Sequence, residues 1–232
     1  MSIELRLGLR PEEPGHSSCG PGTYRADVAA RLERDAATII GRYPQARSAL
    51  LPLLHLVQSE DGYLTVAGIG FCARQLNLTD AEVTAVATFY SMYRRTPTGE
   101  YLVGVCTNTL CAVMGGDAIL QTLQSRLGIK SGQTTDDGRV TLEHVECNAA
   151  CDYAPVVMVN WEFFDNQSPE SAGELVDALR SGDPVTPTRG APLCSFRDTA
   201  RTLAGLSDPR ESNTIGVPTL AGLRAARAEG GE

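Results

Sequence analysis

The chain has 232 residues and a formal net charge of −8 at pH 7, which is enough length for one medium domain or two small ones. The acidic balance and the lack of a basic stripe argue against nucleic acid as a partner. The sequence has no apolar run long enough for a membrane span or a signal peptide, so we expect a cytoplasmic chain. Thiols stay reduced there, and paired cysteines then indicate metal or redox chemistry.

The first part of the chain is predicted to be a flexible arm followed by helices. Residues 1–26 are rich in proline and glycine and show little hydrophobic periodicity. Apolar residues then recur at helical spacing, and Thr79–Glu82 fits a capping box. We expect Cys72 to be a small buried residue, and His55 to be a helix-surface or packed histidine rather than a functional one. Short connections between the helices predict a four-helix bundle over residues 27–95. The expected helices cover 27–40, 47–60, 65–76 and 80–92.

Residues 96–182 change from helical to strand periodicity after a turn at 96–99. The expected order is strand, helix, strand, strand, strand, helix, which predicts a small mixed sheet with helices on its faces. A thioredoxin-like domain is built in this way. The expected fold class is therefore α+β, with an N-terminal four-helix bundle followed by a thioredoxin-like mixed sheet with flanking helices. The expected strands lie at 101–105, 140–145, 156–159 and 163–164, and the helices at 119–127 and 170–180.

The last segment, residues 183–232, contains five prolines among small and charged residues and lacks the periodicity of a domain. We expect an extended tail that binds a partner. One short helix is expected within it, near 196–206.

Four cysteines fall in two pairs, and each pair follows a predicted strand. Cys106 and Cys111 follow the strand at 101–105, and Cys147 and Cys151 follow the next strand. Loops that follow neighbouring strands can surround one metal centre just past the end of a sheet. A [2Fe–2S] cluster takes four thiolates, two on each iron, and these cysteine gaps suit it.

Two other kinds of site stay open on the residues alone. An all-cysteine zinc site also uses four thiolates, usually in pairs with gaps of two to four residues. Thiol–disulfide exchange is a weaker alternative, because it normally uses a CxxC motif at a helix start and neither pair has that spacing. A Rieske centre is not expected, since His144 has no second histidine near the other cysteine pair.

Three motifs together resemble a known family. They are Ala-Thr-Phe-Tyr-Ser-Met-Tyr at 87–93, Val-Cys-Thr-Asn-Thr-Leu-Cys at 105–111, and Glu-Cys-Asn-Ala-Ala-Cys-Asp-Tyr-Ala-Pro at 146–155. Their combination resembles the thioredoxin-like [2Fe–2S] ferredoxin subunit, of NuoE type, of respiratory NADH:quinone oxidoreductase, or complex I. The similarity covers about residues 27–182.

The resemblance implies that the four cysteines Cys106, Cys111, Cys147 and Cys151 ligate one [2Fe–2S] cluster. It implies an electron-transfer subunit of an oxidoreductase, with no substrate site on this chain alone. The implied partners are the NuoF-type flavoprotein, which binds NADH and FMN, and the large NuoG-type iron–sulfur subunit. Such a complex would hold the chain at the cytoplasmic face of the inner membrane.

Two alternative functions accompany this expectation. The same module occurs in NAD-linked hydrogenases and formate dehydrogenases, whose diaphorase units resemble it. From a different class, the chain could be a zinc-stabilised interaction module without redox activity.

The sequence departs from the family pattern at two places near the cysteines. Leu110 stands where the family commonly has proline, and Asn148 and Ala149 stand where it has a Leu-Gly pair. Neither departure removes a ligand. Both are expected to alter the amides that hydrogen-bond to the sulfurs, and so the reduction potential.

Other residues beside the cysteines have expected structural or electrostatic roles. The negative charges of Glu146 and Asp152 lower the potential if they point to the cluster, whereas the alternative is that both face water. Gly104 and the pair Gly115–Gly116 are expected to allow tight packing around the cysteine loops. Pro155 suits the cis-proline that thioredoxin-like domains keep beside their active loop, whereas the alternative is the trans bond of most X–Pro pairs.

Overall fold

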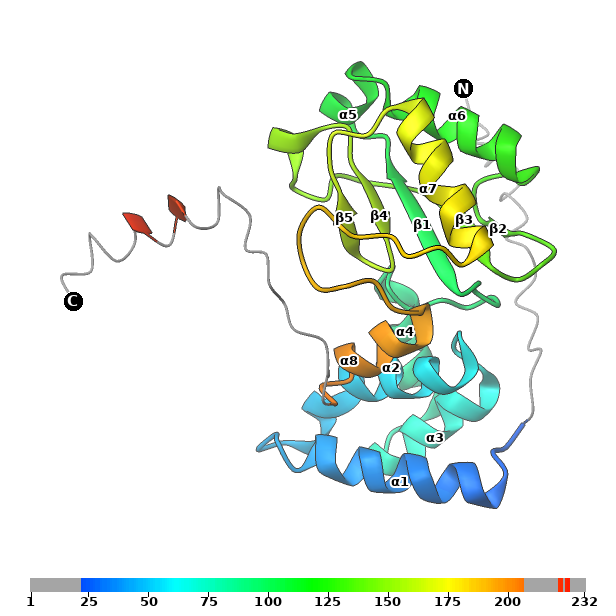
Figure 1. Ribbon diagram of the computed structural model, residues 1–232. Coiled ribbons are helices and arrows are strands. Elements are labelled where there is room, and N and C mark those ends of the chain that lie inside the picture. Colours follow the sequence, from blue (N-terminus) through cyan, green and yellow to red (C-terminus); the bar gives the residue numbers. More distant parts are fainter. Residues whose placement is uncertain (1–21, 207–220, 223, 226–232) are drawn as a thin grey trace, which may run out of the picture. The chain divides into compact units, whose positions relative to one another are not determined.

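The computed structural model describes residues 22–206, 221–222 and 224–225 (Figure 1). The chain divides into two compact units, which meet in the sequence between Thr96 and Pro97. Most of the predicted arm and the distal part of the predicted tail lie outside the described residues. Within the described part, no helix is both long enough and apolar enough to cross a membrane.

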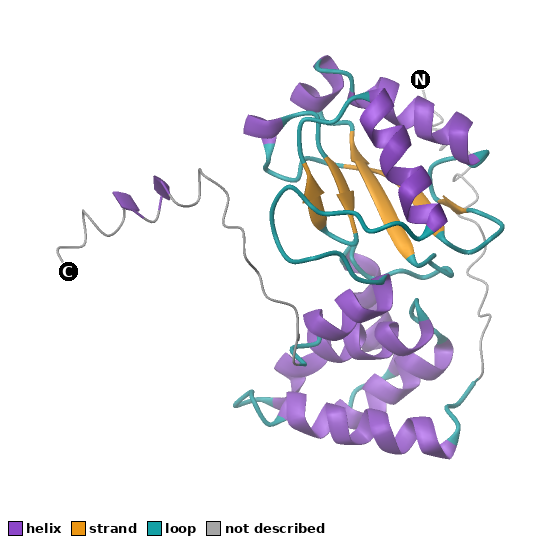
Figure 2. Cartoon of the chain, in the orientation of Figure 1, coloured by secondary structure: helices purple, strands orange, loops and turns teal. Residues whose placement is uncertain are grey.

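The first unit is helical where it is described (Figure 2). The capping box at Thr79 is confirmed, because its hydroxyl accepts from the Glu82 N–H while the Glu82 carboxylate accepts from the Thr79 N–H. The last helix ends earlier than predicted, since Tyr90 has extended backbone angles. The elements are α1 (Ala26–Ile40), a 3₁₀ turn (Ala46–Ala49), α2 (Leu50–Asp61), α3 (Val66–Leu76) and α4 (Asp80–Phe89).

Helix α2 lies at the centre of this unit, where it contacts α1 and α3, and α3 contacts α4. Leucine and valine side chains around α2 are almost fully buried, and each contributes about 1.5–3 kcal/mol relative to exposure. Cys72 is buried, as predicted. His55 is also buried, and its ring centroid lies 4.8 Å from that of Tyr93.

The second unit contains a five-stranded mixed sheet with the order β2-β3-β1-β4-β5 (Figure 1). Strand β1 is parallel to β3, and the other neighbouring pairs are antiparallel. The predicted mixed sheet is confirmed, and β2 adds a two-residue edge strand too short to show a periodicity. The strands are β1 (Tyr101–Cys106), β2 (Gln133–Thr134), β3 (Val140–Val145), β4 (Val157–Val159) and β5 (Glu162–Phe164).

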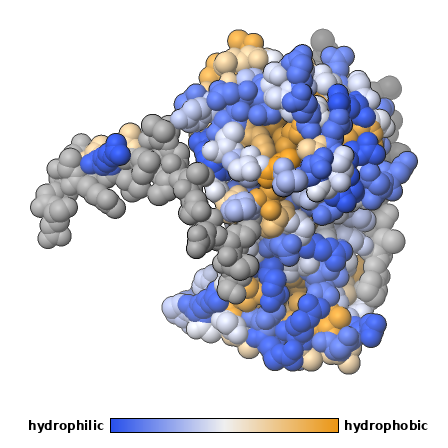
Figure 3. Space-filling view, in the orientation of Figure 1, coloured by the Kyte–Doolittle hydropathy of each residue, from blue (hydrophilic) through white to orange (hydrophobic). Residues whose placement is uncertain are grey.

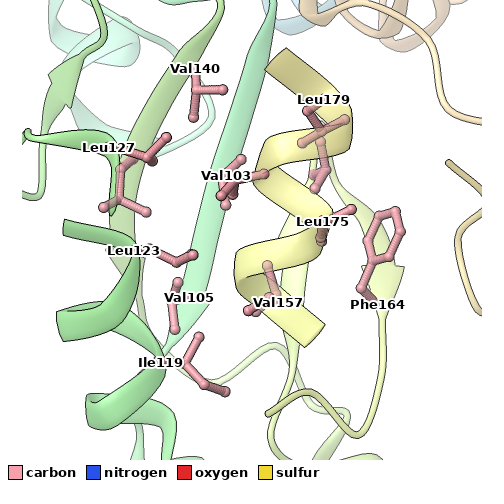
Figure 4. Packing of buried hydrophobic residues seen from close by; sticks show 14 residues of the cluster. Val103, Val105, Ile119, Leu123, Leu127, Val140, Val157, Phe164, Leu175 and Leu179 are labelled. Carbon is pink, nitrogen blue, oxygen red and sulfur yellow. The ribbon is translucent and has the colours of Figure 1, made fainter. Parts of the chain in front are cut away.

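Helices α6 (Gly116–Leu127) and α7 (Pro169–Ser181) lie side by side over one face of the sheet (Figure 4). Alternate residues of β1, such as Val103 and Val105, point into this layer because side chains alternate along a strand. The helices contribute apolar stripes, so the layer holds β1 and β3 in place from one side. The buried residues of the helices are Ile119, Leu123, Leu127, Ala172, Leu175, Val176 and Leu179.

The compact unit continues past Gly182, the residue at which the predicted domain ends. Val185 and Leu193 pack against the core of the sheet, and the Thr188 N–H donates to the Phe163 carbonyl. Helix α8 (Phe196–Leu203) follows, with a serine cap, near the position predicted for a short helix. The proline-rich composition predicts an extended chain here, but individual apolar residues of this segment still pack against the core of the sheet.

Candidate metal centre

The two cysteine pairs come together because β1 and β3 are parallel neighbours. Cys106 is the last residue of β1 and pairs with Val145, the last residue of β3. The Thr107 N–H donates to the Val145 carbonyl, which keeps the two strand ends joined. Cys147 follows two residues later. Both cysteine loops therefore leave the same edge of the sheet, as the sequence predicted.

The first pair is held by a short helix that the sequence analysis did not predict. Asn108 caps α5 (Thr109–Val113), which carries Cys111. Cys106 and Cys111 are both buried and belong to one cluster of buried side chains, together with Ala150, Ala154 and Val156.

Glycine is required where α6 begins, directly behind this pair. A Cβ atom on Gly116 would lie 2.5 Å from the Cys106 carbonyl oxygen and 2.9 Å from that of Cys111. Likewise, a Cβ on Gly104 would lie 2.9 Å from Val145 Cγ1. The prediction of tight packing is thus confirmed for these two glycines. Gly115 differs, because a Cβ there would meet no atom within 4 Å and its φ of +110° is what favours glycine.

The second pair is exposed and lies in a tight loop. The sulfurs of Cys147 and Cys151 are 3.5 Å apart. The Ala149 N–H donates to Cys147 Sγ at 3.3 Å, and Ala149 has a positive φ of 54°. An L-residue rarely adopts this left-handed conformation, and glycine adopts it freely.

A hydrogen bond joins the two cysteine loops. Asn108 Nδ2 donates to Glu146 Oε2 at 2.8 Å, so the same asparagine caps α5 and binds the residue before Cys147. Glu146 therefore does not simply face water. The sequence signal for this contact is weak, since an asparagine before a helix predicts only the cap.

The electrostatics of the four thiols are linked. Burial and a hydrogen bond with the Cys106 thiol raise the pKa of Cys111 to about 11, while the Val156 N–H that binds its sulfur lowers it. The Cys147 thiol raises the pKa of Cys151, and the Asp152 carboxylate adds to this effect. Four thiolates close together need positive charge to offset their repulsion, and metal ions supply it.

The donor set fits an iron–sulfur cluster in its chemistry. Two pairs of thiols, one buried and one exposed, match a centre that takes two thiolates on each of two irons. Backbone amides already donate to one sulfur in each pair, those of Val156 and Ala149. Over the described residues, no group of three or more His, Cys, Asp and Glu side chains is arranged to hold a metal ion as it stands.

Arg189 binds the segment after α7 to the loop that follows the second pair. Its guanidinium lies 4.4 Å from the Phe163 ring centroid and 5.2 Å from that of Tyr153, two residues after Cys151. It also pairs with the buried Asp165 carboxylate at 3.0 Å. Sequence reasoning missed this residue because it lies in the proline-rich segment. The peptide bond between Ala154 and Pro155, nearby, is cis, which is one of the two conformations that the sequence left open.

Helix α5 presents apolar side chains to the surface beside the cysteines. Leu110, Val113 and Met114 are 42%, 81% and 53% exposed. Figure 3 shows hydrophobic surface at the end of this unit that α5 occupies in Figure 1. We call these three residues the α5 patch.

The chain is similar to characterised proteins over most of its length. A sequence model of the thioredoxin-like [2Fe–2S] ferredoxin family matches residues 36–180. The E subunit of NADH-quinone oxidoreductase from Mycobacterium tuberculosis is 68% identical over 230 residues, which cover 97% of this chain and 91% of that protein. The corresponding protein of Rickettsia bellii, which has the same name, is 39% identical over 149 residues, covering 63% of this chain and 89% of that protein.

A solved structure shares the fold. The crystal structure of an NAD⁺-reducing [NiFe]-hydrogenase in the H₂-reduced state superimposes with a TM-score of 0.53 at 23% identity. The match covers 58% of this chain and 22% of the hydrogenase chain. The chain therefore belongs to the thioredoxin-like [2Fe–2S] ferredoxin family, in the group that contains the E subunit of NADH-quinone oxidoreductase.

Proposed function

We propose that this chain is the electron-transfer subunit of an NADH-quinone oxidoreductase and carries one [2Fe–2S] cluster. The cluster, when bound, accepts and releases one electron at a time. The observation that carries the proposal is the convergence of two cysteine pairs at the ends of parallel strands β1 and β3. The identity of 68% with a protein named as the E subunit of NADH-quinone oxidoreductase supports the same function.

In this proposal each cysteine loop supplies the two thiolates that bind one of the two irons. Cys106 and Cys111 form the buried pair, and Cys147 and Cys151 form the exposed pair. The Val156 and Ala149 amides donate to sulfur and stabilise its negative charge. The Asn108 bridge to Glu146 keeps the loops at a fixed separation.

The proposed partners are a NuoF-type flavoprotein, which holds FMN and NADH, and a NuoG-type iron–sulfur subunit. The α5 patch supports docking near the cluster, because exposed apolar groups beside a site suit a protein interface. The complex would lie at the cytoplasmic face of the inner membrane. We further propose that helices α1 to α4 form a four-helix bundle over 27–95, and that the segment 183–232 binds a neighbouring subunit.

The NAD-linked hydrogenase alternative has less support. The hydrogenase likeness, at 23% identity, concerns the fold. The relatives with 39–68% identity over long stretches are named as NADH-quinone oxidoreductase subunits. A zinc-stabilised module is disfavoured by the match to an iron–sulfur family.

Anaerobic purification with iron and sulfide analysis tests the cluster. We expect about two irons and two sulfides per chain, and an EPR signal of spin one-half after reduction with dithionite. Replacing Cys111 or Cys147 by alanine is expected to abolish the signal. Replacing Cys194, a thiol outside the two pairs, is the matched control and is expected to leave it unchanged. One zinc per chain and no colour would contradict the proposal.

Co-purification with a flavoprotein partner tests the docking surface. Val113→Asp places a charge in the α5 patch and is expected to reduce the flavoprotein captured by a tagged chain. Val66→Asp is the control, since Val66 is a 50% exposed valine at the start of α3 in the first unit. Equal capture by both variants would exclude the α5 patch as the interface.

A further inference from the structure

The side chain of Asn148 occupies an unusual position in the second cysteine loop. In the sequence, Asn148 stands between Cys147, a proposed ligand, and Ala149, whose N–H already donates to Cys147 Sγ. Its amide nitrogen Nδ2 is buried and has no hydrogen-bond partner among the described residues. An apolar residue would fill this place without leaving a buried donor.

A buried donor without a partner is costly. Leaving such a group unsatisfied forfeits its solvation without a compensating hydrogen bond, so a buried amide in a native protein normally has an acceptor. Asn108, the asparagine of the other cysteine loop, shows the contrast, because its Nδ2 donates to Glu146. None of the described residues supplies an acceptor for Asn148 Nδ2, so a bound group is a natural source of one.

We propose that Asn148 Nδ2 donates a hydrogen bond to a sulfur of the bound cluster, and that this contact raises the reduction potential. The inference rests on the proposed function, since it requires the cluster. Binding of the cluster would bring sulfur atoms to this loop. One of these atoms would accept a hydrogen bond from Asn148 Nδ2. The Ala149 N–H already donates to Cys147 Sγ, so the loop directs one donor at sulfur.

The direction of the effect follows from charge. Reduction adds one electron and makes the sulfurs more negative, so a hydrogen bond to sulfur is stronger in the reduced state. The Asn148 amide therefore stabilises the reduced state more than the oxidised one. Losing the donor is expected to lower the equilibrium constant for reduction by roughly threefold to tenfold, the range for one modest hydrogen bond.

Redox titration followed by EPR tests the inference on the purified, cluster-loaded chain. Asn148→Leu and Asn148→Ala both remove the donor and are expected to shift the midpoint potential downward. Asn148→Gln keeps an amide and is expected to stay closer to wild type. Pulsed EPR after ¹⁵N labelling of asparagine is expected to show a nitrogen coupling in the wild-type chain that both donor-free variants lose.

The possible results separate the two proposals. No spin one-half signal in the wild-type chain would overturn the proposed function and the inference together. A normal cluster whose potential is the same with asparagine, leucine and alanine would overturn the inference alone and indicate that water satisfies the amide. If the Asn148→Leu chain does not hold iron, the midpoint potential of the Asn148→Ala chain tests the inference, because alanine is smaller. A Gln variant shifted as far as the Ala variant would also refute the role of the donor.

Discussion

Gly116 offers a sharp test of how the fold supports the cysteine loops. Its missing Cβ leaves room for the carbonyl groups of Cys106 and Cys111, which would lie 2.5 and 2.9 Å from that atom. Both neighbours are backbone, so neither can rotate away as a side chain would. The substitution Gly116→Ala therefore has to displace α6 or the first cysteine loop.

Two opposing effects set the size of the change. Alanine in place of glycine gains about 1 kcal/mol in a helix interior and less at the first residue of a helix, where Gly116 lies. Inserting a methyl group into a close-packed site costs about 1–3 kcal/mol, and contacts below 3 Å with two carbonyl oxygens favour the upper end. We expect a net loss of about 1–2 kcal/mol. For a unit of this size each kcal/mol lowers the melting temperature by about 3–5 °C.

The fluorescence of Trp161 reports on this unit specifically, because the chain has one tryptophan and it lies beside β5. Thermal unfolding followed by this signal, together with iron content, measures the effect. Gly173→Ala in α7 of the same unit is the control, since the first atom its Cβ would meet is the end of the flexible Arg126 side chain, at 3.2 Å. A Gly116→Ala chain with an unchanged melting temperature and full iron would refute the steric reasoning.

Three further predictions concern charge. The Asp152 carboxylate acts electrostatically on the Cys151 thiol, so Asp152→Asn is expected to raise the midpoint potential of the cluster, and an unchanged EPR redox titration would contradict this. Burial lowers the pKa of His55 from 6.5 to about 4, so the unfolded chain binds the proton first as pH falls. The stability of the first unit is then full above about pH 6.5 and declines by about 1.4 kcal/mol per pH unit down to about pH 4. His55→Phe is expected to flatten this decline in urea unfolding measured by circular dichroism, and the same slope in both chains would exclude His55 as its source. Arg189→Leu leaves the buried Asp165 carboxylate without its cation and is expected to cost about 3–5 kcal/mol, measured by tryptophan fluorescence in urea. The double variant that also carries Asp165→Leu is expected to recover part of the loss, and equal losses in both would argue against the ion pair.

The sequence predicted the elements whose signals are local. Helix α4 was identified from its Thr79–Glu82 capping box, and α7 from a proline start and a glycine end, because these signals lie within a few residues of each other. Strands β1 and β3 were identified from apolar runs directly before each cysteine pair. The four candidate ligands followed from their spacing and motifs, and their role as cluster ligands remains a prediction.

Contacts between distant segments were not predictable in this way. The Asn108 bridge to Glu146 spans 38 residues, and the Arg189 contacts join a proline-rich segment to the loop after Cys151. Such pairs have no common periodicity or motif. The buried Asn148 amide without a hydrogen-bond partner could not be predicted either, because it depends on burial in the folded chain. The sequence alone shows only that Asn148 departs from the family pattern.

By itself, the sequence identified the candidate ligands, the kinds of helix and strand that surround them, and the family resemblance. Its composition and local periodicity are sufficient for this, because caps, turns and apolar stripes act over one or two turns of chain. The tertiary structure alone decided which pair is buried, which amides reach sulfur, and that residues beyond Gly182 belong to the compact unit. These features depend on the parallel pairing of β1 with β3 and on side-chain packing across the sheet, which bring together groups far apart in the chain.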